Sequence, residues 1–529
     1  MAITKLSDLL RSRWVLLLVL AIFVACKVPH LAYPFYCDEG WVYAPAVKAM
    51  AANGPSLLPG SIPSALSRGH PLLFHFLCSL WIRCFGVSNG ALHSFPLAFS
   101  VFFLIALYEV CRKLFGTRVA TLALLLVATQ VIFFVQASFV LPEIMVALFA
   151  LLSLYYYVQD RFVLLAIVLC LLFFTKESGV VFGAVMGVDA LVCLFTRKSE
   201  RLLRRAARIA AIVAPTLLIA SFFVLQKAIE GWYLLPLHSN LIQTDWDYLY
   251  GLFRDCLRWT FKGDIANVAL FLFVTALSAL PAIKQRNARY LFLVLPAIIV
   301  FILTDKWIVE HTGDLVWMLL FVSFFSVACY APLYLNRQMG VPARKFILLL
   351  GCCFGAYLCF SSLTVLTYRY LLIEIIFMLI FLAVCINIFI EHSYISLYPV
   401  ALSGILAAGV LGIYTDDGHD DTDLEAFHAM TVQKSAIRYL EQKLAFDKEI
   451  NAACFWELAQ LTDTGQGFLN TGKTFTKINW DTATANTDYV ILDNICWNGR
   501  YEQTAKNPLF RLVYRATSGR SWTEVYQRK

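Results

Sequence analysis

The chain lacks charge for its length. Only 15% of its 529 residues are Asp, Glu, Lys or Arg, whereas 60% are hydrophobic and the mean hydropathy is +0.71. A soluble protein of this size could not bury so much apolar surface. The composition therefore excludes an ordinary soluble enzyme and indicates a protein whose main solvent is lipid.

Several motifs that bind metals, nucleotides or phosphates are also missing. No C-x-x-C pair, P-loop, G-x-G-x-x-G or H-E-x-x-H occurs in a supporting context, so we expect no metal and no cofactor. We interpret the basic run from Arg197 to Arg208 as a topology determinant that contacts anionic lipid, so we expect no nucleic-acid partner. Most of the 15 cysteines lie in apolar segments, where cysteine behaves as a small hydrophobic residue. Cys454 and Cys496 share the polar tail and could form a disulfide, but the spacing leaves this open.

Long apolar runs recur through the first four fifths of the chain, and each spanning helix needs ~20 such residues. The first run lacks a small-residue cleavage site, so we read it as a retained span. The pattern predicts about thirteen spans. They begin near Trp14, Ala91, Val119, Pro142, Phe162, Gly179, Ile209, Ile265, Tyr290, Leu315, Phe346, Tyr370 and Tyr398.

The basic residues between these runs fall on one side of the predicted bundle. Because positive charge collects on the cytoplasmic side, this side is cytoplasmic, and the opposite side holds Asp38 and Glu39, the stretch Gln226–Asp264, the turn Asp305–Asp314 and the C-terminus. The basic clusters are Lys5, Arg11 and Arg13; Arg112, Lys113 and Arg118; Arg161; Arg197, Lys198, Arg201, Arg204, Arg205 and Arg208; Lys284, Arg286 and Arg289; and Arg337, Arg344 and Lys345.

The last part of the chain changes character. Residues 414–529 combine a helical pattern over Asp423–Leu444 with strand-like runs at Tyr489–Leu492 and Phe510–Tyr514. We predict two domains: a polytopic α-helical membrane module, 1–413, and an extracytoplasmic α/β domain, 414–529. The first external loop, 33–90, should contain two short helices, over Val42–Ala52 and Pro71–Phe85.

Charged residues gather where the predicted spans meet the external side. Ionisable groups at this depth are costly to bury and tend to mark substrate paths or chemistry. Acids could take a proton from an acceptor, and cations could hold a phosphate leaving group. These residues could also have purely structural roles. Asp38 and Glu39 could cap a helix, and Lys176 and Arg369 could be interfacial cations at helix ends. The candidates are Asp38, Glu39, His70, Glu143, Lys176 and Arg369.

Several short motifs occur in a familiar order. They are Tyr36-Cys37-Asp38-Glu39-Gly40-Trp41-Val42-Tyr43, Arg68-Gly69-His70-Pro71-Leu72-Leu73-Phe74, Phe85-Gly86-Val87-Ser88, Val140-Leu141-Pro142-Glu143, Thr175-Lys176-Glu177-Ser178-Gly179 and Tyr368-Arg369-Tyr370. In this order they resemble membrane glycosyltransferases of the GT-C class, the protein O-mannosyltransferases and the lipid A aminoarabinose transferases. The resemblance is best between Trp14 and Phe195.

The resemblance implies a reaction and a division of roles. The donor would be a polyprenyl-phosphate-linked monosaccharide, transferred with inversion to a hydroxyl or amine of a lipid, glycan or protein acceptor. Asp38 would be the catalytic base, and Glu39 and Glu143 would position acceptor or sugar. Lys176, Arg369 and His70 would bind the donor phosphate. No metal is implied.

The sequence leaves the membrane and the class of function partly open. A bacterial inner membrane, with an undecaprenyl carrier, is favoured over the endoplasmic reticulum, with a dolichyl carrier. The aromatic stretch Gln226–Asp264 could form a loop that closes over the sugar. The alternative function is a membrane transporter or lipid flippase, which would place charges in the middle of the spans rather than at one face.

Overall fold

The structure is a computed structural model. It describes residues 13–196, 201–242, 244–262, 265–284, 286, 339–363, 367–392, 397–416, 418, 420–480, 486–496, 504 and 507–529. The predicted spans near Tyr290 and Leu315 and the turn Asp305–Asp314 lie outside these residues. So do the basic residues Lys5, Arg11, Arg197, Lys198, Arg289 and Arg337.

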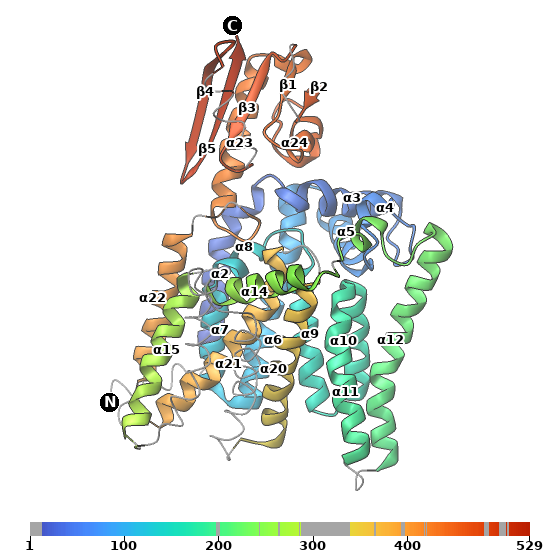
Figure 1. The fold of residues 1–529 in the computed structure, drawn as a ribbon, viewed down its shortest axis with the longest axis vertical. Helices are drawn as coiled ribbons and strands as arrows, with labels where there is room; N and C mark the ends of the chain where they lie inside the picture. Colours follow the sequence, from blue (N-terminus) through green and yellow to red (C-terminus); the bar gives the residue numbers. More distant parts are fainter. Residues whose placement is uncertain are drawn as a thin grey trace.

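A bundle of apolar helices forms the larger part of the molecule (Figure 1). Every predicted span that lies within the described residues is helical. These helices are α2 (Trp14–Lys27), α6 (Asn89–Phe115), α7 (Thr117–Ala128), α9 (Glu143–Val158), α10 (Phe162–Thr175), α11 (Val180–Thr196), α12 (Leu202–Glu230), α15 (Ile265–Lys284), α20 (Val341–Ser361), α21 (Leu372–Glu391) and α22 (Tyr398–Thr415).

Seven helical segments of the described chain are long and apolar enough to cross a membrane. The chain is therefore a polytopic helical membrane protein, although the predicted count of thirteen spans is not confirmed. α7, α9 and α10 are shorter apolar helices, and α7 is followed by a break and the short α8 (Val131–Gln136). The seven segments are Trp14–Ala32, Asn89–Phe115, Glu177–Thr196, Leu202–Glu230, Val341–Ser361, Tyr368–Glu391 and Tyr398–Thr415.

The core of the bundle surrounds α21. This helix is almost continuously apolar, and 94% of the most hydrophobic part of the segment Tyr368–Glu391 is buried inside the protein. It packs against α7, α9, α15 and α20. Since an apolar helix could also face lipid, its central place follows from this packing rather than from its hydropathy.

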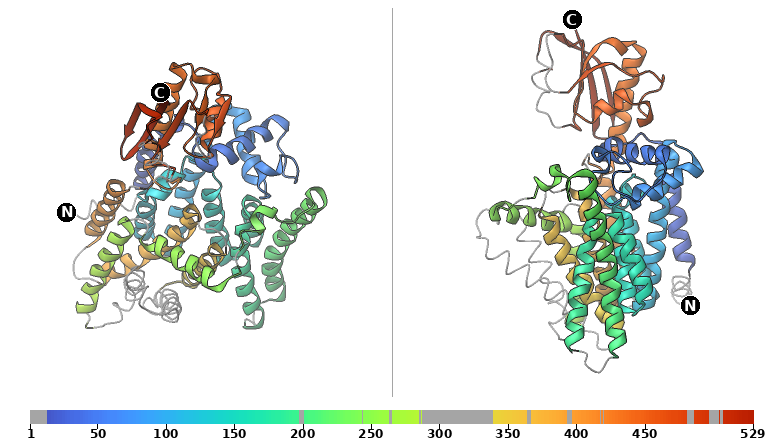
Figure 2. Two further views of the ribbon diagram at one scale, coloured as in Figure 1. Left: turned by 45° about the horizontal axis from the view of Figure 1, so that its top comes forward. Right: turned by 90° about the vertical axis from the view of Figure 1, so that its right-hand side faces the viewer.

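The first external loop folds into short helices at one end of the bundle, beneath the C-terminal domain (Figures 1 and 2). The predicted helices over Val42–Ala52 and Pro71–Phe85 are confirmed, within a few residues. The loop comprises two short helical turns, η1 (Val28–Ala32) and the π-helical η2 (Glu39–Tyr43), and then α3 (Ala44–Asn53), α4 (Ser64–Ser67) and α5 (Leu73–Phe85).

The predicted loop over Gln226–Asp264 is wrong for most of its length. α12 continues to Glu230, and α13 (Pro236–Ser239) and α14 (Trp246–Lys262) follow. In α14, Phe253, Leu257 and Thr260 recur at helical spacing on the packed side, whereas Trp246 is exposed. This amphipathic helix lies across the bundle (Figure 1). The many aromatic residues concealed the helical period.

The C-terminal residues form an α/β domain, as predicted. Its five strands follow the order β2-β1-β3-β5-β4, and α23 packs on β4 and β5. β1 pairs in parallel with β2 and β3, and β5 pairs antiparallel with β3 and β4. Cys454 and Cys496 are joined in a disulfide. The elements are α23 (Glu425–Gln442), β1 (Glu449–Asn451), α24 (Glu457–Thr462), β2 (Lys477–Asn479), β3 (Tyr489–Asp493), β4 (Phe510–Ser518) and β5 (Ser521–Arg528).

The C-terminal domain and the first external loop hold each other at the same end of the bundle (Figure 1). Phe35 N–H donates to the Gln466 carbonyl at 3.0 Å, and Gln466 Nε2 donates to the Gly40 carbonyl at 2.7 Å. The end of α11 and the start of α12 lie at the other end of the bundle, and Arg208 of α12 is buried and pairs with Asp160 at 3.0 Å. The basic run thus has a packing role as well as the predicted topological one.

The separation of the two ends predicts opposite labelling. In sealed vesicles of known orientation, Arg201→Cys and Lys448→Cys should react with a membrane-impermeant maleimide from opposite sides, Lys448→Cys from the extracytoplasmic side. The unmodified chain measures labelling of the native cysteines. Labelling of both positions from one side would mean that the span count is wrong by an odd number.

Candidate functional site

Arg369 is the centre of the polar cluster at the end of the bundle. It lies in the helical turn η4 (Tyr368–Leu371), which begins the most buried span, and its side chain is only 5% exposed. One terminal nitrogen donates to Asp38 and the other to Asp421. Its Nε lies 3.5 Å from Oε1 of Glu143. A single guanidinium thus joins three carboxylates from three separate parts of the chain.

Lys176 adds a second cation to the same cluster. It follows α10 in an extended conformation, just before the turn η3 (Glu177–Gly179). Its Nζ donates to Oε1 of Glu143 at 3.0 Å and lies 3.8 Å from the ring centroid of Tyr370. Glu143 opens α9 after Pro142, an ordinary place for an acid, and here it contacts both cations. The predicted meeting of Asp38, Glu143, Lys176 and Arg369 is therefore present in the structure.

Asp38 is the most open acid of the cluster. Its side chain is 35% exposed, against 3% for Glu143 and 8% for Asp421. It precedes the π-helical turn η2, and Nε1 of Trp41 donates to its Oδ1 at 3.0 Å. Burial acts to raise the pKa of Asp38, but the charge and hydrogen bond of Arg369 outweigh burial and hold that pKa below its ordinary value. Asp38 is thus an ionised carboxylate held in one orientation with an open face.

Asp421 was not among the residues predicted from the sequence. It lies in the short linker between α22 and α23, within the acidic stretch 416–423, and its carboxylate binds Arg369. Burial raises the pKa of Asp421 to about 6, in opposition to Arg369. The signal that could have found it is the acidic stretch itself, because it follows the last span at the external end, where Asp38 also lies.

Glu39 points away from the cluster. Its side chain is fully buried, and its two oxygens accept from the backbone N–H groups of Tyr36 at 3.1 Å and Val140 at 2.7 Å. His93 Nε2 lies 2.8 Å from its Oε1, and His93 Nδ1 is 2.9 Å from the Leu31 carbonyl. Because a carbonyl only accepts, Nδ1 is the donor there. Glu39 therefore ties the loop that bears Asp38 to the start of α9, and it does not face the open side of Asp38.

His70 lies beside the cluster rather than in it. Its Nδ1 is 2.9 Å from the carboxylate of Glu177, the residue after Lys176. The preceding Gly69 has φ +73°, and an added Cβ would lie 2.8 Å from the ring of Trp232. Glycine is thus needed both for its backbone conformation and for the close approach of the segment after α12.

Possible metal ligands come together at one place in the described part of the chain. Cys454, Glu457 and Cys496 lie near one another in the C-terminal domain. The two cysteines are joined in the disulfide, so their sulfur atoms are not available as thiolate ligands. This group lies apart from the polar cluster around Arg369.

Comparisons with known proteins agree with the motifs. The sequence profile of the dolichyl-phosphate-mannose-protein mannosyltransferase family matches residues 69–225, which include His70, Glu143 and Lys176. No curated protein sequence matches significantly.

Three solved structures show the range of weak structural similarity. ArnT from Cupriavidus metallidurans bound to undecaprenyl phosphate is 14% identical, with 97% of this chain and 98% of that chain covered and a TM-score of 0.42. The oligosaccharyltransferase of Archaeoglobus fulgidus is 13% identical, with 93% and 71% covered and a TM-score of 0.43. The mycobacterial arabinofuranosyltransferase AftD is 12% identical, with 98% and 40% covered and a TM-score of 0.39.

The profile match confirms the resemblance predicted from the motifs. It covers the segment that supplies the second acid and the lysine of the cluster, whereas Asp38 and Arg369 lie outside it. Over residues 69–225 the chain is thus similar to the dolichyl-phosphate-mannose-protein mannosyltransferases, and this similarity indicates a glycosyltransferase of the membrane.

Proposed function

We propose that the protein moves a monosaccharide from a polyprenyl-phosphate carrier to a hydroxyl or amine of a lipid, glycan or protein acceptor, with inversion at the anomeric carbon. The observation that supports this best is an open carboxylate, Asp38, held by a guanidinium that belongs to a two-cation cluster. A base beside cations suits a reaction in which one partner loses a proton while the other leaves as a phosphate.

Asp38 is the proposed base. The acceptor O–H or N–H gives its proton to the partly exposed carboxylate of Asp38 while its heteroatom forms a bond to the anomeric carbon. The bond from that carbon to the phosphate oxygen breaks on the opposite face of the sugar, and polyprenyl phosphate leaves with the bonding electrons. The hydrogen bonds from Arg369 and Trp41 hold the carboxylate ready for this transfer without reorganisation.

Lys176 and Arg369 are the proposed partners of the leaving phosphate. A guanidinium has five N–H donors, and Asp38, Asp421 and Glu143 face only part of this set. Lys176 has further N–H donors besides the one on Glu143. Both cations can therefore keep their carboxylate partners while binding a phosphate oxygen. His70 stands next to Lys176 through Glu177 and could contact the same carrier.

The remaining acids receive positioning roles in this proposal. Glu143 holds the two cations at one spacing, because its Oε1 contacts both. Glu39 has no free face for a sugar, since backbone amides and His93 surround it, so we assign it to fixing the Asp38 loop rather than to the substrate.

We place the reaction at the extracytoplasmic face, in a bacterial inner membrane. The support is the basic residues around the start of α12, at the far end of the bundle, and the contacts of the Asp38 loop with the C-terminal domain. The alternative of a transporter or flippase is less well supported, because the charges gather at one end of the helices. Incubation of the purified protein with a panel of polyprenyl-phosphate sugars, followed by mass spectrometry of acceptor and carrier, distinguishes transfer from transport.

The first prediction concerns the base. Asp38→Asn should reduce turnover by about 10²–10⁴-fold, the usual cost of losing a general base, because the amide cannot accept the proton. Donor binding, measured with a nonhydrolysable polyprenyl-phosphonate sugar, should change little. Turnover within a few-fold of the wild type would exclude Asp38 as the base.

The second prediction concerns the phosphate. Lys176→Ala and Arg369→Ala should each weaken binding of the phosphonate analogue and lower kcat, because the charge on the phosphate grows as the bond breaks. Lys176→Arg should keep only part of the affinity and kcat that Lys176→Ala loses, because a planar guanidinium replaces a compact ammonium group. If both alanine variants bind the analogue as tightly as the wild type does, Lys176 and Arg369 do not bind the phosphate and only anchor helix ends.

The third prediction concerns pH. Because Arg369 lowers the pKa of Asp38, wild-type activity should fall on the acid side only as the pH drops through this lowered value. In Arg369→Gln the pKa of Asp38 should rise, so the residual activity should be lost at a higher pH. Asp421→Asn is the matched control: it removes a neighbouring negative charge but keeps Arg369, so the acid limb should not move upward. An upward shift in both variants would contradict this assignment.

A further inference from the structure

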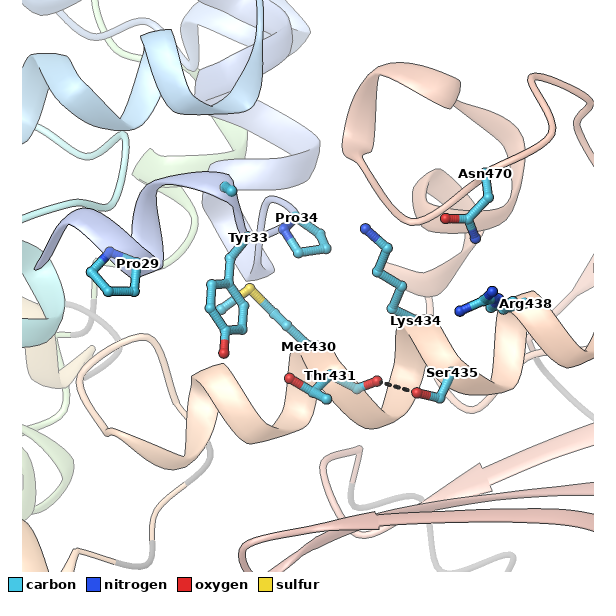
Figure 3. Close-up of a pocket in the computed structure, with 10 residues that line it drawn as sticks. Pro29, Tyr33, Pro34, Met430, Thr431, Lys434, Ser435, Arg438 and Asn470 are labelled. Atoms are coloured by element: carbon cyan, nitrogen blue, oxygen red, sulfur yellow. Dashed lines mark hydrogen bonds between the residues drawn. The ribbon is translucent and has the colours of Figure 1, made fainter.

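A pocket lies between the membrane module and the C-terminal domain, and its lining includes no member of the Asp38 cluster. It has a volume of about 300 Å³, the lower end of the range for small-molecule sites. One wall comes from the end of the first span and the start of the external loop, and the other comes from α23 (Figure 3). The lining residues are Pro29, Ala32, Tyr33, Pro34, Met430, Thr431, Lys434, Ser435, Arg438 and Asn470.

The wall formed by α23 presents two cations without counter-ions. Lys434 and Arg438 lie one helical turn apart, and within the described chain neither side chain makes an ion pair or a hydrogen bond. Like charges at this spacing destabilise a helix. The nearest acid on the same helix, Glu441, is occupied, because its two oxygens accept from Asn470 and Thr471. Burial and the charge of Arg438 also lower the pKa of Lys434. An anion in the pocket would remove this repulsion.

The hydroxyl of Ser435 and the side-chain amide of Asn470 already have partners. The Ser435 hydroxyl donates to the Thr431 carbonyl, and Asn470 Nδ2 donates to Glu441. Hydrogen-bond donors for a ligand therefore come from Lys434, Arg438 and the hydroxyl of Tyr33. Pro29, Pro34 and the ring of Tyr33 form an apolar wall that faces α23, and Met430 lies on α23 itself (Figure 3). The pocket combines a cationic wall for an anion with an apolar wall for a less polar neighbouring group.

The position of the pocket points to the membrane surface. Val28–Ala32 is the turn that ends the Trp14–Ala32 candidate span, so Pro29 and Ala32 lie where that span leaves the lipid. We propose that Lys434 and Arg438 bind a phosphate group in this pocket, presented by a lipid headgroup or by a soluble phosphate compound. This inference is independent of the proposed transfer reaction, because it concerns binding alone.

The lipid source is tested with a photoactivatable phosphatidic acid bearing a diazirine close to its glycerol. Purified full-length protein should give crosslinks that map to Pro29–Pro34 or to Met430–Arg438, whereas the matching diacylglycerol should not. In Lys434→Gln/Arg438→Gln the apparent affinity should fall about a hundredfold, about tenfold for each lost charged hydrogen bond. Lys434→Arg/Arg438→Lys should retain binding, because it keeps both charges.

The soluble source is tested by hydrogen exchange with inorganic phosphate against sodium chloride of equal ionic strength. Protection of residues 28–34 and 425–442 that is lost in Lys434→Gln/Arg438→Gln supports a soluble ligand; a crosslink without such protection supports a lipid. Lys443→Gln, at the exposed end of the same helix, is the matched control and should behave like the wild type. If both probes leave these segments unchanged in the wild type, or if the double glutamine variant binds as well as the wild type, the proposal is overturned.

Discussion

The buried guanidinium of Arg369 is the constraint on which the site depends. Its partners come from the first external loop, from the start of α9 and from the linker to the C-terminal domain. Removing one member of a buried charge group costs about 3–5 kcal/mol, because the others remain buried without compensation. Arg369 thus fixes three segments with one side chain, and it does so at the point where the most buried span begins.

The C-terminal domain contributes a second constraint from above. Gln466 binds the backbone on both sides of Asp38, through Phe35 and Gly40, and Lys48 Nζ donates to the Gly465 carbonyl at 2.8 Å. The Asp38 loop is therefore held from below by Arg369 and from above by a turn of the domain. A base on a loop gains precision when packed elements hold it from both sides, so the domain belongs to the architecture of the site.

Hydropathy and charge predicted most of the arrangement, because the membrane restricts what the chain can do. An apolar run of sufficient length must form a helix in lipid, so the span starts followed from the sequence. Once the spans alternate, Asp38, Glu143, Lys176 and Arg369 must reach the same end. The sequence did not reveal α14, because its aromatic residues suggested an interfacial loop. It also did not reveal Asp421, because its acidic stretch was assigned to the tail.

The divergence of Asp38 and Glu39 shows a further limit of sequence patterns. Adjacent residues on a tight turn point in different directions, and the π-helical turn η2 sends Glu39 into the protein while Asp38 stays partly open. The sequence motif therefore does not show which of the two acids takes part in chemistry and which has a structural role. The hydrogen-bond partners in the structure distinguish them. Glu39 has the structural role, because its two oxygens accept from the backbone N–H groups of Tyr36 and Val140.

The charge balance of the cluster links it to a phosphate ligand. Asp38, Glu143 and Asp421 bring three carboxylates to Arg369 and Lys176, and the charge of Arg68 also acts on Asp38. A phosphate would add negative charge to this cluster, and its binding would favour uptake of a proton by one acid. Asp421 is the best suited of these acids, because its pKa is raised to about 6 whereas that of Asp38 is lowered. Protonation of Asp421 would thus compensate for an incoming phosphate, while the lowered pKa of Asp38 keeps the proposed base ionised.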